Sequence, residues 1–168
     1  PEDYSEVGSS YPAMFSLHGY TSTALTNMSY TGFMKQADIN DFVVIYPQGL
    51  VHETKGGTHW NTDEIGPGNS VNSIEFLESV LDWVGQNYNI DLNRFYSAGM
   101  SNGGFMSYHL ACNITSKISA IASVTGSMSV FSYDNCNAQP TSVMQIHGSV
   151  DTVVPYDIAR KSVDLLSN

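Results

Sequence analysis

The segment 99–103, with the sequence GMSNG, places Ser101 between two glycines. A strand-like run, 94–98, leads directly into it, and a helix-like run follows. A serine on a sharp strand-to-helix turn needs small neighbours, because the backbone folds so tightly there that larger side chains would collide. The segment therefore predicts the nucleophile of a serine hydrolase. The alternative is an ordinary loop, since the chain contains 14 glycines and many serines.

A serine hydroxyl is a weak nucleophile near neutral pH. It needs a histidine to take its proton and a carboxylate to orient that histidine. We expect Asp151 to be this carboxylate, because it lies just past a strand-like run at 142–146. The alternative is that Asp151 only shapes a turn or caps the helix that follows, as aspartates often do.

The attack of a serine on an ester carbonyl creates an oxyanion, which needs two N–H donors. The residue after the nucleophile supplies one donor, here the backbone amide of Asn102. We assign the second donor to the amide of Tyr20, in the loop after the first strand, because Gly19 lets the backbone come close. The alternative is that Gly19 only allows the chain to turn and has no part in an oxyanion site.

The charge of the chain excludes several classes of partner. Sixteen acidic residues against six basic ones give a formal net charge of −10, which repels nucleic-acid phosphates and anionic membranes. We therefore expect no nucleic-acid and no membrane partner. No apolar run reaches about 18 residues, and the first residues are polar and acidic, so we expect neither a membrane span nor an export signal within the sequence.

The two cysteines offer a possible crosslink. Cys112 lies near the end of a predicted helix, and Cys136 lies in an Asn-rich loop that can fold back over that helix. A disulfide between them would stabilise the fold by about 3 kcal/mol in the chain-entropy treatment and would imply an oxidising compartment. Two unpaired thiols in a cytosolic protein are the alternative.

Strand-like and helix-like segments alternate along the 168 residues, a length typical of one domain. Apolar runs predict strands at 13–17, 42–46, 94–98, 119–125 and 142–146. Helical spacing and start signals predict helices at about 71–88, 102–112 and 156–166, with a long loop at 50–69. A further helix is expected at about 23–37, where the apolar spacing is irregular and Gly32 interrupts it. This order is typical of a mostly parallel sheet with helices on both faces. The loops after its strands meet at one edge and can form a single site.

Several segments, in the right order, resemble the α/β-hydrolase esterases of the polyhydroxybutyrate depolymerase and feruloyl esterase group. The matching segments are 17–19, 37–49, 89–96, 99–106, 110–112 and 146–156. The resemblance implies a partial α/β-hydrolase fold, with 1–168 as a single, incomplete catalytic domain. It assigns Ser101 as the nucleophile and Asp151 as the triad acid, and it implies a disulfide at Cys112, which we pair with Cys136.

The same resemblance implies a serine carboxylesterase that works through an acyl-enzyme on Ser101, with no metal and no cofactor. Family members are mostly exported bacterial enzymes, so we expect a secreted or periplasmic location. Their substrates are small-molecule or polymer esters of the hydroxyalkanoate, feruloyl or acetyl-polysaccharide type. The resemblance implies no particular oligomeric state.

His59 and Trp60 lie in a loop that the resemblance places near the substrate crevice. There an aromatic plane could pack against a ferulate ring or a sugar, so we expect both residues to bind substrate. The alternative is a partly buried loop anchor.

The sequence does not place the histidine of the triad. His18 and His147 each precede a glycine at a strand end, where we expect them to shape loops. His109 lies two helical turns beyond Ser101 and would point away from its hydroxyl.

The remaining histidines, His52 and His59, precede the serine, whereas α/β-hydrolases run in the order Ser, Asp, His. No histidine follows Asp151. We therefore expect the base to lie beyond the end of this sequence, with a loop histidine as the alternative. A catalytically inactive α/β-hydrolase-like binding module that lacks its base is the alternative function. A peptidase or acyltransferase on the same fold would use the same residues.

Overall fold

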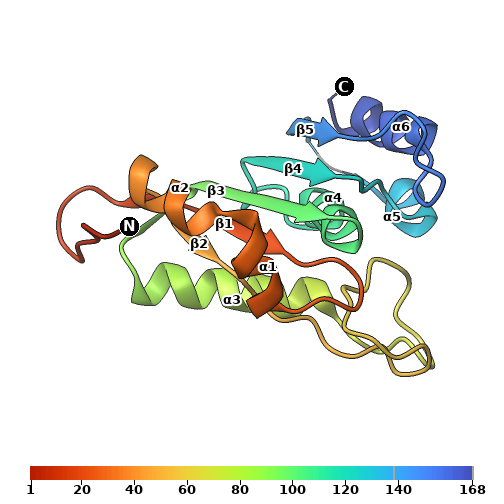
Figure 1. Cartoon of the computed structure of the whole chain (residues 1–168), viewed down its shortest axis with the longest axis horizontal. Helices are drawn as coiled ribbons and strands as arrows, with labels where there is room; N and C mark the ends of the chain where they lie inside the picture. The colour runs from red at the N-terminus through yellow and green to blue at the C-terminus, as the bar shows by residue number, and fades with distance from the viewer. Residues whose placement is uncertain (138, 168) are drawn as a thin grey trace.

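The computed structural model describes residues 1–137 and 139–167, which contain a five-stranded sheet in the order β2-β1-β3-β4-β5. The strands are β1 (Tyr11–Leu17), β2 (Val43–Ile45), β3 (Ile90–Met100), β4 (Ala120–Val124) and β5 (Ser142–Ile146). All four neighbouring pairs are parallel, so the carboxyl ends of the strands share one edge (Figure 1). The five predicted strands are thus all present.

Helices connect the strands, as parallel pairing requires. They are α1 (Ala24–Thr31), α2 (Phe33–Asn40), α3 (Ser73–Asn87), α4 (Asn102–Asn113), α5 (Val130–Asp134) and α6 (Tyr156–Ser167). The single helix predicted at 23–37 was wrong, because Gly32 adopts a left-handed backbone with φ 68° and divides it into α1 and α2. The short helix α5 lies where only an Asn-rich loop was expected.

One face of the sheet is buried under α3 and α4. Ala13, Phe15 and Leu17 alternate along β1, and each has no exposed surface. They share the main apolar core with residues of α3 such as Leu77 and Leu81. The i, i+4 spacing of these leucines is the amphipathic pattern that predicted α3, and the Asn72 side chain caps the start of this helix.

The opposite face is only partly covered. Over β1, Asn27 of α1 donates from Nδ2 to the backbone oxygen of Ser16 at 2.9 Å. Over β3 to β5 the face is open, with Tyr96 37% exposed and Met144 63% exposed. An apolar groove of about 710 Å³ runs across these strands. The predicted α/β class with helices on both faces is confirmed, with uneven cover.

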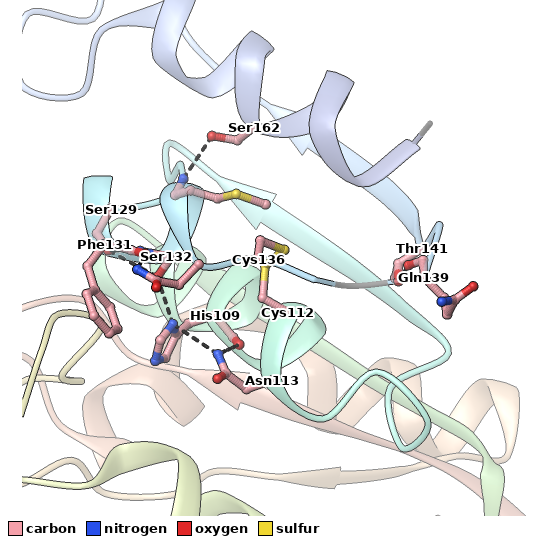
Figure 2. Close-up of a disulfide and its surroundings, with 12 residues drawn as sticks. His109, Cys112, Asn113, Ser129, Phe131, Ser132, Cys136, Gln139, Thr141 and Ser162 are labelled. Carbon is pink, nitrogen blue, oxygen red and sulfur yellow. Dashed lines mark hydrogen bonds between the residues drawn. A yellow bond between two sulfur atoms is a disulfide. The ribbon is translucent and has the colours of Figure 1, made fainter.

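A disulfide joins Cys112 on α4 to Cys136, which follows α5, as expected (Figure 2). Beside it, Nδ1 of His109 lies 2.7 Å from the Ser132 hydroxyl (Figure 2). The Ser129 side chain caps α5 by accepting a hydrogen bond from the Ser132 amide at 3.1 Å. Together these contacts attach the α5 segment to the buried side of α4.

Of the helices within residues 1–137 and 139–167, none combines the length and the apolar character that crossing a membrane requires.

Loss of the Cys112–Cys136 disulfide is expected to lower the free energy of unfolding by about 3 kcal/mol, because the bridge closes a loop between residues 24 positions apart. Urea denaturation with and without a reductant measures the difference. The double variant Cys112→Ser, Cys136→Ser should have the same free energy of unfolding as the reduced protein, and the reductant should not change it. A difference below about 1 kcal/mol would contradict the expected restraint on the unfolded chain.

Acidification is expected to destabilise the fold through His109. Burial lowers the pKa of His109 from 6.5 to about 4, against a smaller opposing effect of Asp63. Below pH 6.5 the unfolded chain therefore binds a proton that the folded protein takes up only near pH 4. Stability should fall through this window, by on the order of 2 kcal/mol.

Unfolding free energies measured between pH 7 and pH 4 test this expectation. The variant His109→Asn keeps a polar group near the Ser132 hydroxyl but cannot titrate in this range. Its stability should depend less steeply on pH than that of the parent protein. Parallel curves would assign the acid sensitivity to other groups.

Candidate active site

Ser101 lies on the turn between β3 and α4, as expected. Its backbone has φ 52° and ψ −119°, a conformation that costs a non-glycine residue on the order of 1–3 kcal/mol. Two backbone hydrogen bonds hold Ser101 in place. Its backbone N–H donates to the backbone oxygen of Val124 at 2.9 Å, and its backbone oxygen accepts from the N–H of Phe105 at 2.9 Å. The surrounding sheet and helix therefore impose the strained turn.

The two glycines of the turn are required by close backbone contacts. A Cβ on Gly99 would lie 2.3 Å from the carbonyl carbon of Gly103. A Cβ on Gly103 would lie 2.2 Å from the backbone oxygen of Leu17, at the end of β1. No larger residue fits at either position without moving backbone, which is the steric requirement that the sequence pattern suggested.

The loop after β1 lies directly against this turn. A Cβ on Gly19 would lie 3.4 Å from the Met100 oxygen and 3.8 Å from Cβ of Ser101. Tyr20, the next residue, is fixed by its own hydroxyl, which donates to the backbone oxygen of Gly56. The two residues assigned as oxyanion donors, Tyr20 and Asn102, thus lie on segments that meet beside Ser101.

Asn102 also has a structural function that the sequence did not reveal. Its Oδ1 accepts from the backbone N–H of Trp60 at 2.7 Å, and its Nδ2 donates to the oxygen of Trp60 at 2.9 Å. Both groups of the side-chain amide are used, so it holds the long loop against the start of α4. The backbone N–H of Asn102, in the first turn of a helix, has no intrahelical partner and can donate to an oxyanion.

Asp151 lies in the loop after β5, where its Oδ1 accepts from the N–H groups of Val153 at 2.8 Å and Val154 at 2.9 Å. These two hydrogen bonds lower the pKa of the Asp151 carboxyl, and the bond from Val154 has the larger effect. Asp151 therefore does shape a turn, as the alternative interpretation held. Its other oxygen, Oδ2, lies 3.5 Å from Nε2 of His147 and is not used in the turn.

The rings of His147 and His18 are held in place by hydrogen bonds to their neighbours. His147 accepts at Nδ1 from Gln145 at 2.9 Å and donates from Nε2 to the Val154 oxygen at 2.8 Å. His18 accepts at Nε2 from the Gly49 amide at 2.9 Å, and burial lowers its pKa. Both rings have structural functions in loops, as expected from their positions.

None of the five histidines hydrogen-bonds the Ser101 hydroxyl within the described part of the chain. Nδ1 of His109 is hydrogen-bonded to the Ser132 hydroxyl of α5. Nδ1 of His52 accepts from the backbone amides of Thr54 and Lys55, both at 3.3 Å. The ring of His52 lies 4.6 Å from that of His59. The base of a triad is thus not assembled among residues 1–137 and 139–167.

A cavity of about 520 Å³ adjoins the two proposed oxyanion donors, and we name it the loop cavity. Its walls are Tyr20, His52, Thr54, Lys55, His59, Trp60, Asn61, Thr62, Asp63, Pro67, Gly68, Asn69 and Asn102. The long loop at 50–69 supplies most of this lining, so the loop is part of the candidate site.

The expected substrate platform at Trp60 needs correction. The Trp60 side chain is 1% exposed, its Nε1 donates to the His18 oxygen at 2.9 Å, and its ring lies 4.9 Å from the His18 ring. A ring buried in this way offers no face to a sugar or a ferulate, so Trp60 anchors the loop instead. His59 lines the loop cavity.

Sequence reasoning missed the polar residues that organise this loop, notably Asn61, Asn69 and the side chain of Asn102. The partners of the Asn61 and Asn69 side chains lie two to ten residues away within the loop, whereas the partner of Asn102 lies 42 residues away, which no local spacing reveals. The one signal in the sequence was the density of asparagines from 61 to 72, since asparagine often bonds nearby backbone in loops.

The variant Gly103→Ala is expected to lose at least about 2 kcal/mol of stability, because its new methyl group would overlap the Leu17 oxygen. Urea denaturation measures the loss. Gly66→Ala is the matched control, since nothing lies within 4 Å of its Cβ position, and it should stay within about 0.5 kcal/mol of the parent. Equal stabilities for the two variants would contradict the close contact at the turn.

Solved structures share the fold of this chain. The acetyl xylan esterase from Aspergillus awamori superposes with a TM-score of 0.76 at 15% identity, covering 95% of this chain and 69% of that chain. At such low identity, the similarity establishes the α/β-hydrolase fold and nothing finer.

Sequence comparison finds relatives among esterases. A bifunctional acetylxylan esterase/xylanase of Neocallimastix patriciarum is 31% identical over 152 residues, which are 90% of this chain and 21% of that protein. A probable feruloyl esterase C of Aspergillus niger is 26% identical over 163 residues, covering 94% of this chain and 54% of that protein. This chain therefore spans about half or less of the length of these relatives. The family described as "Esterase PHB depolymerase" matches residues 7–167, and the chain belongs to that family.

Proposed function

We propose that the protein is a serine carboxylesterase that hydrolyses carboxylic esters through an acyl-enzyme on Ser101. The observation that carries the proposal is the strained turn at Ser101, with φ 52°, at the start of α4. Backbone strain of this kind is concentrated at functional sites. The family and the esterase relatives point to the same reaction class.

In this mechanism a base takes the proton of the Ser101 hydroxyl while its oxygen forms a bond to the ester carbonyl carbon. The carbonyl oxygen becomes an oxyanion and accepts hydrogen bonds from the backbone amides of Asn102 and Tyr20. When the tetrahedral intermediate collapses, the bond to the alcohol breaks and the alcohol leaves with the proton from the base. Water then repeats the sequence on the acyl-enzyme and releases the acid.

Asp151 has the properties that the triad acid needs. Two backbone amides hold its Oδ1 and lower the pKa of the carboxyl, so it is ionised at neutral pH. Its Oδ2 is left to accept from the histidine base. The two oxygens thus allow the turn-shaping and the catalytic functions to coexist.

The substrates we propose are small-molecule or polymer esters, since the relatives are named acetylxylan and feruloyl esterases. His59 is the proposed substrate contact from the long loop, and Trp60 acts by positioning that loop. The disulfide supports an oxidising location, secreted or periplasmic.

The intact mass before and after treatment with a fluorophosphonate probe tests the proposal. The parent protein should gain one adduct, which Ser101→Ala should lose while keeping its stability. Such a probe labels only a serine whose hydroxyl is activated by a base. The same samples should then hydrolyse 4-nitrophenyl acetate in proportion to labelling.

A second candidate is a binding module without a base. It is favoured by one observation, that no histidine hydrogen-bonds Ser101 within the described residues. A folded protein that gains no adduct and hydrolyses no ester would replace the esterase proposal with this one.

A further inference from the structure

The backbone oxygen of Thr62, in the long loop, is held by two side chains of α5. It accepts from the Ser129 hydroxyl at 2.6 Å and from the Ser132 hydroxyl at 3.1 Å, residues that lie 67 and 70 positions away in sequence. Thr62 lines the loop cavity and is 6% exposed, so bulk water does not replace these donors freely. The wall of the loop cavity at Thr62 is therefore attached to α5.

The α5 segment is itself fixed to the body of the protein. Cys136, just after α5, is joined by the disulfide to Cys112 on α4 (Figure 2). Nδ1 of His109, also on α4, lies 2.7 Å from the Ser132 hydroxyl. Within α5, the Ser129 side chain accepts from the Ser132 amide at 3.1 Å. The two hydroxyls that hold Thr62 thus stand on a rigid support.

The hydrogens of this cluster can all be assigned. Each serine hydroxyl has one hydrogen, and the Thr62 oxygen has two lone pairs, so it can accept from both. With its ring proton on Nδ1, His109 donates to Ser132 Oγ, and Ser132 in turn donates to Thr62. Both hydroxyl hydrogens are used within the protein. This bonding suits residues that position a loop, and it gives neither serine a part in bond breaking.

The attachment at Thr62 determines the course of the neighbouring residues. Trp60, two residues earlier, is fixed by Asn102. Asn61 and Asp63, on either side of Thr62, both line the loop cavity, and the Asp63 amide donates to Asn61 Oδ1 at 2.9 Å. Residues 61–63 therefore form a wall that is held at its centre by α5. The two serines of α5 lie outside the cavity lining in the described part of the chain.

We propose that Ser129 and Ser132 are positioning residues of the candidate site, which fix the wall 61–63 of the loop cavity through the Thr62 oxygen. The kinetic consequence rests on the proposed esterase function: an ester bound against this wall should lose affinity when the wall is released. The turn at Ser101 is held by other contacts, at Gly99 and Gly103, so its reactivity should not change.

Amide hydrogen exchange tests the positioning without requiring hydrolysis. Ser132→Ala removes one donor to Thr62 but keeps the Ser132 amide, so α5 retains its cap. The Asp63 amide should then exchange about 5-fold faster, as expected for one lost hydrogen bond. The Trp60 amide, which Asn102 holds, should change by less than about 2-fold, because its own attachment remains.

Three further variants control this experiment. Ser129→Asp keeps an acceptor for the cap of α5 but loses the donor to Thr62, so it should resemble Ser132→Ala. Ser129→Thr retains the hydroxyl and should exchange like the parent. Ser79→Ala is the matched control, since it deletes a hydroxyl that donates to the Glu75 oxygen at 2.8 Å on the exposed side of α3. It should leave the exchange of residues 61–63 unchanged.

Steady-state kinetics with 4-nitrophenyl ferulate test the consequence for the reaction. In Ser132→Ala and Ser129→Asp, KM should rise about 5-fold, while kcat stays within about 2-fold of the parent. Ser129→Thr should restore the parent KM. This division separates positioning from a general loss of stability, because an unfolded fraction would lower the apparent kcat and leave KM unchanged.

The outcomes distinguish this inference from the proposed function. Faster exchange at Asp63 but not at Trp60, together with the rise in KM, supports the inference. Equal acceleration at both amides, no acceleration at Asp63, or a released wall with an unchanged KM overturns it. If Ser132→Ala does not fold, Ser129→Asp and Ser129→Thr still decide. If the parent hydrolyses no ester, the esterase proposal fails, and amide exchange alone decides whether α5 positions the wall.

Discussion

The site depends on a steric constraint, the contact of three backbone segments at the end of the sheet. The end of β1, the end of β3 and the first turn of α4 approach so closely at Gly99 and Gly103 that no side chain fits between them. Similar contact continues along α4, where a Cβ on Gly104 would lie 2.7 Å from the Ser123 hydroxyl. Because packed backbone cannot relax, it holds Ser101 in a conformation that an isolated chain would avoid.

The same packing explains why loops far apart in sequence form one site. A parallel sheet brings the loops after β1, β3 and β5 to a common edge, but it does not fix their conformations. Polar side chains fix them instead: Asp151 organises its own turn, and Asn102 holds the backbone of Trp60. The core thus determines where the site lies, while hydrogen bonds to loop backbone determine its shape.

The parts of the fold that local rules control were predictable from the sequence. The apolar runs of the strands, the leucine spacing of α3 and the glycines around Ser101 follow from periodicity and steric limits. The interruption of the helical pattern at Gly32 was visible in the sequence, but the division into two helices was not predicted, because glycine inside a helix is often tolerated at a cost of about 1 kcal/mol. The burial of Trp60 and the orientation of Asn69 depend on the tertiary arrangement of the loop, which no pattern of residue types contains.

The paired hydrogen bonds between Asn102 and Trp60 have a consequence for how this scaffold can diversify. They fasten the long loop against the start of α4, and a second attachment holds it against the loop after β1, where Tyr20 donates to the Gly56 oxygen and the Thr21 amide donates to the Thr58 oxygen. New selectivities are therefore expected from exchange of the mostly exposed stretch 63–68, which leaves both attachments in place. For directed evolution, libraries that vary this stretch and spare the attachment points should retain a higher fraction of folded members than libraries that vary the whole loop.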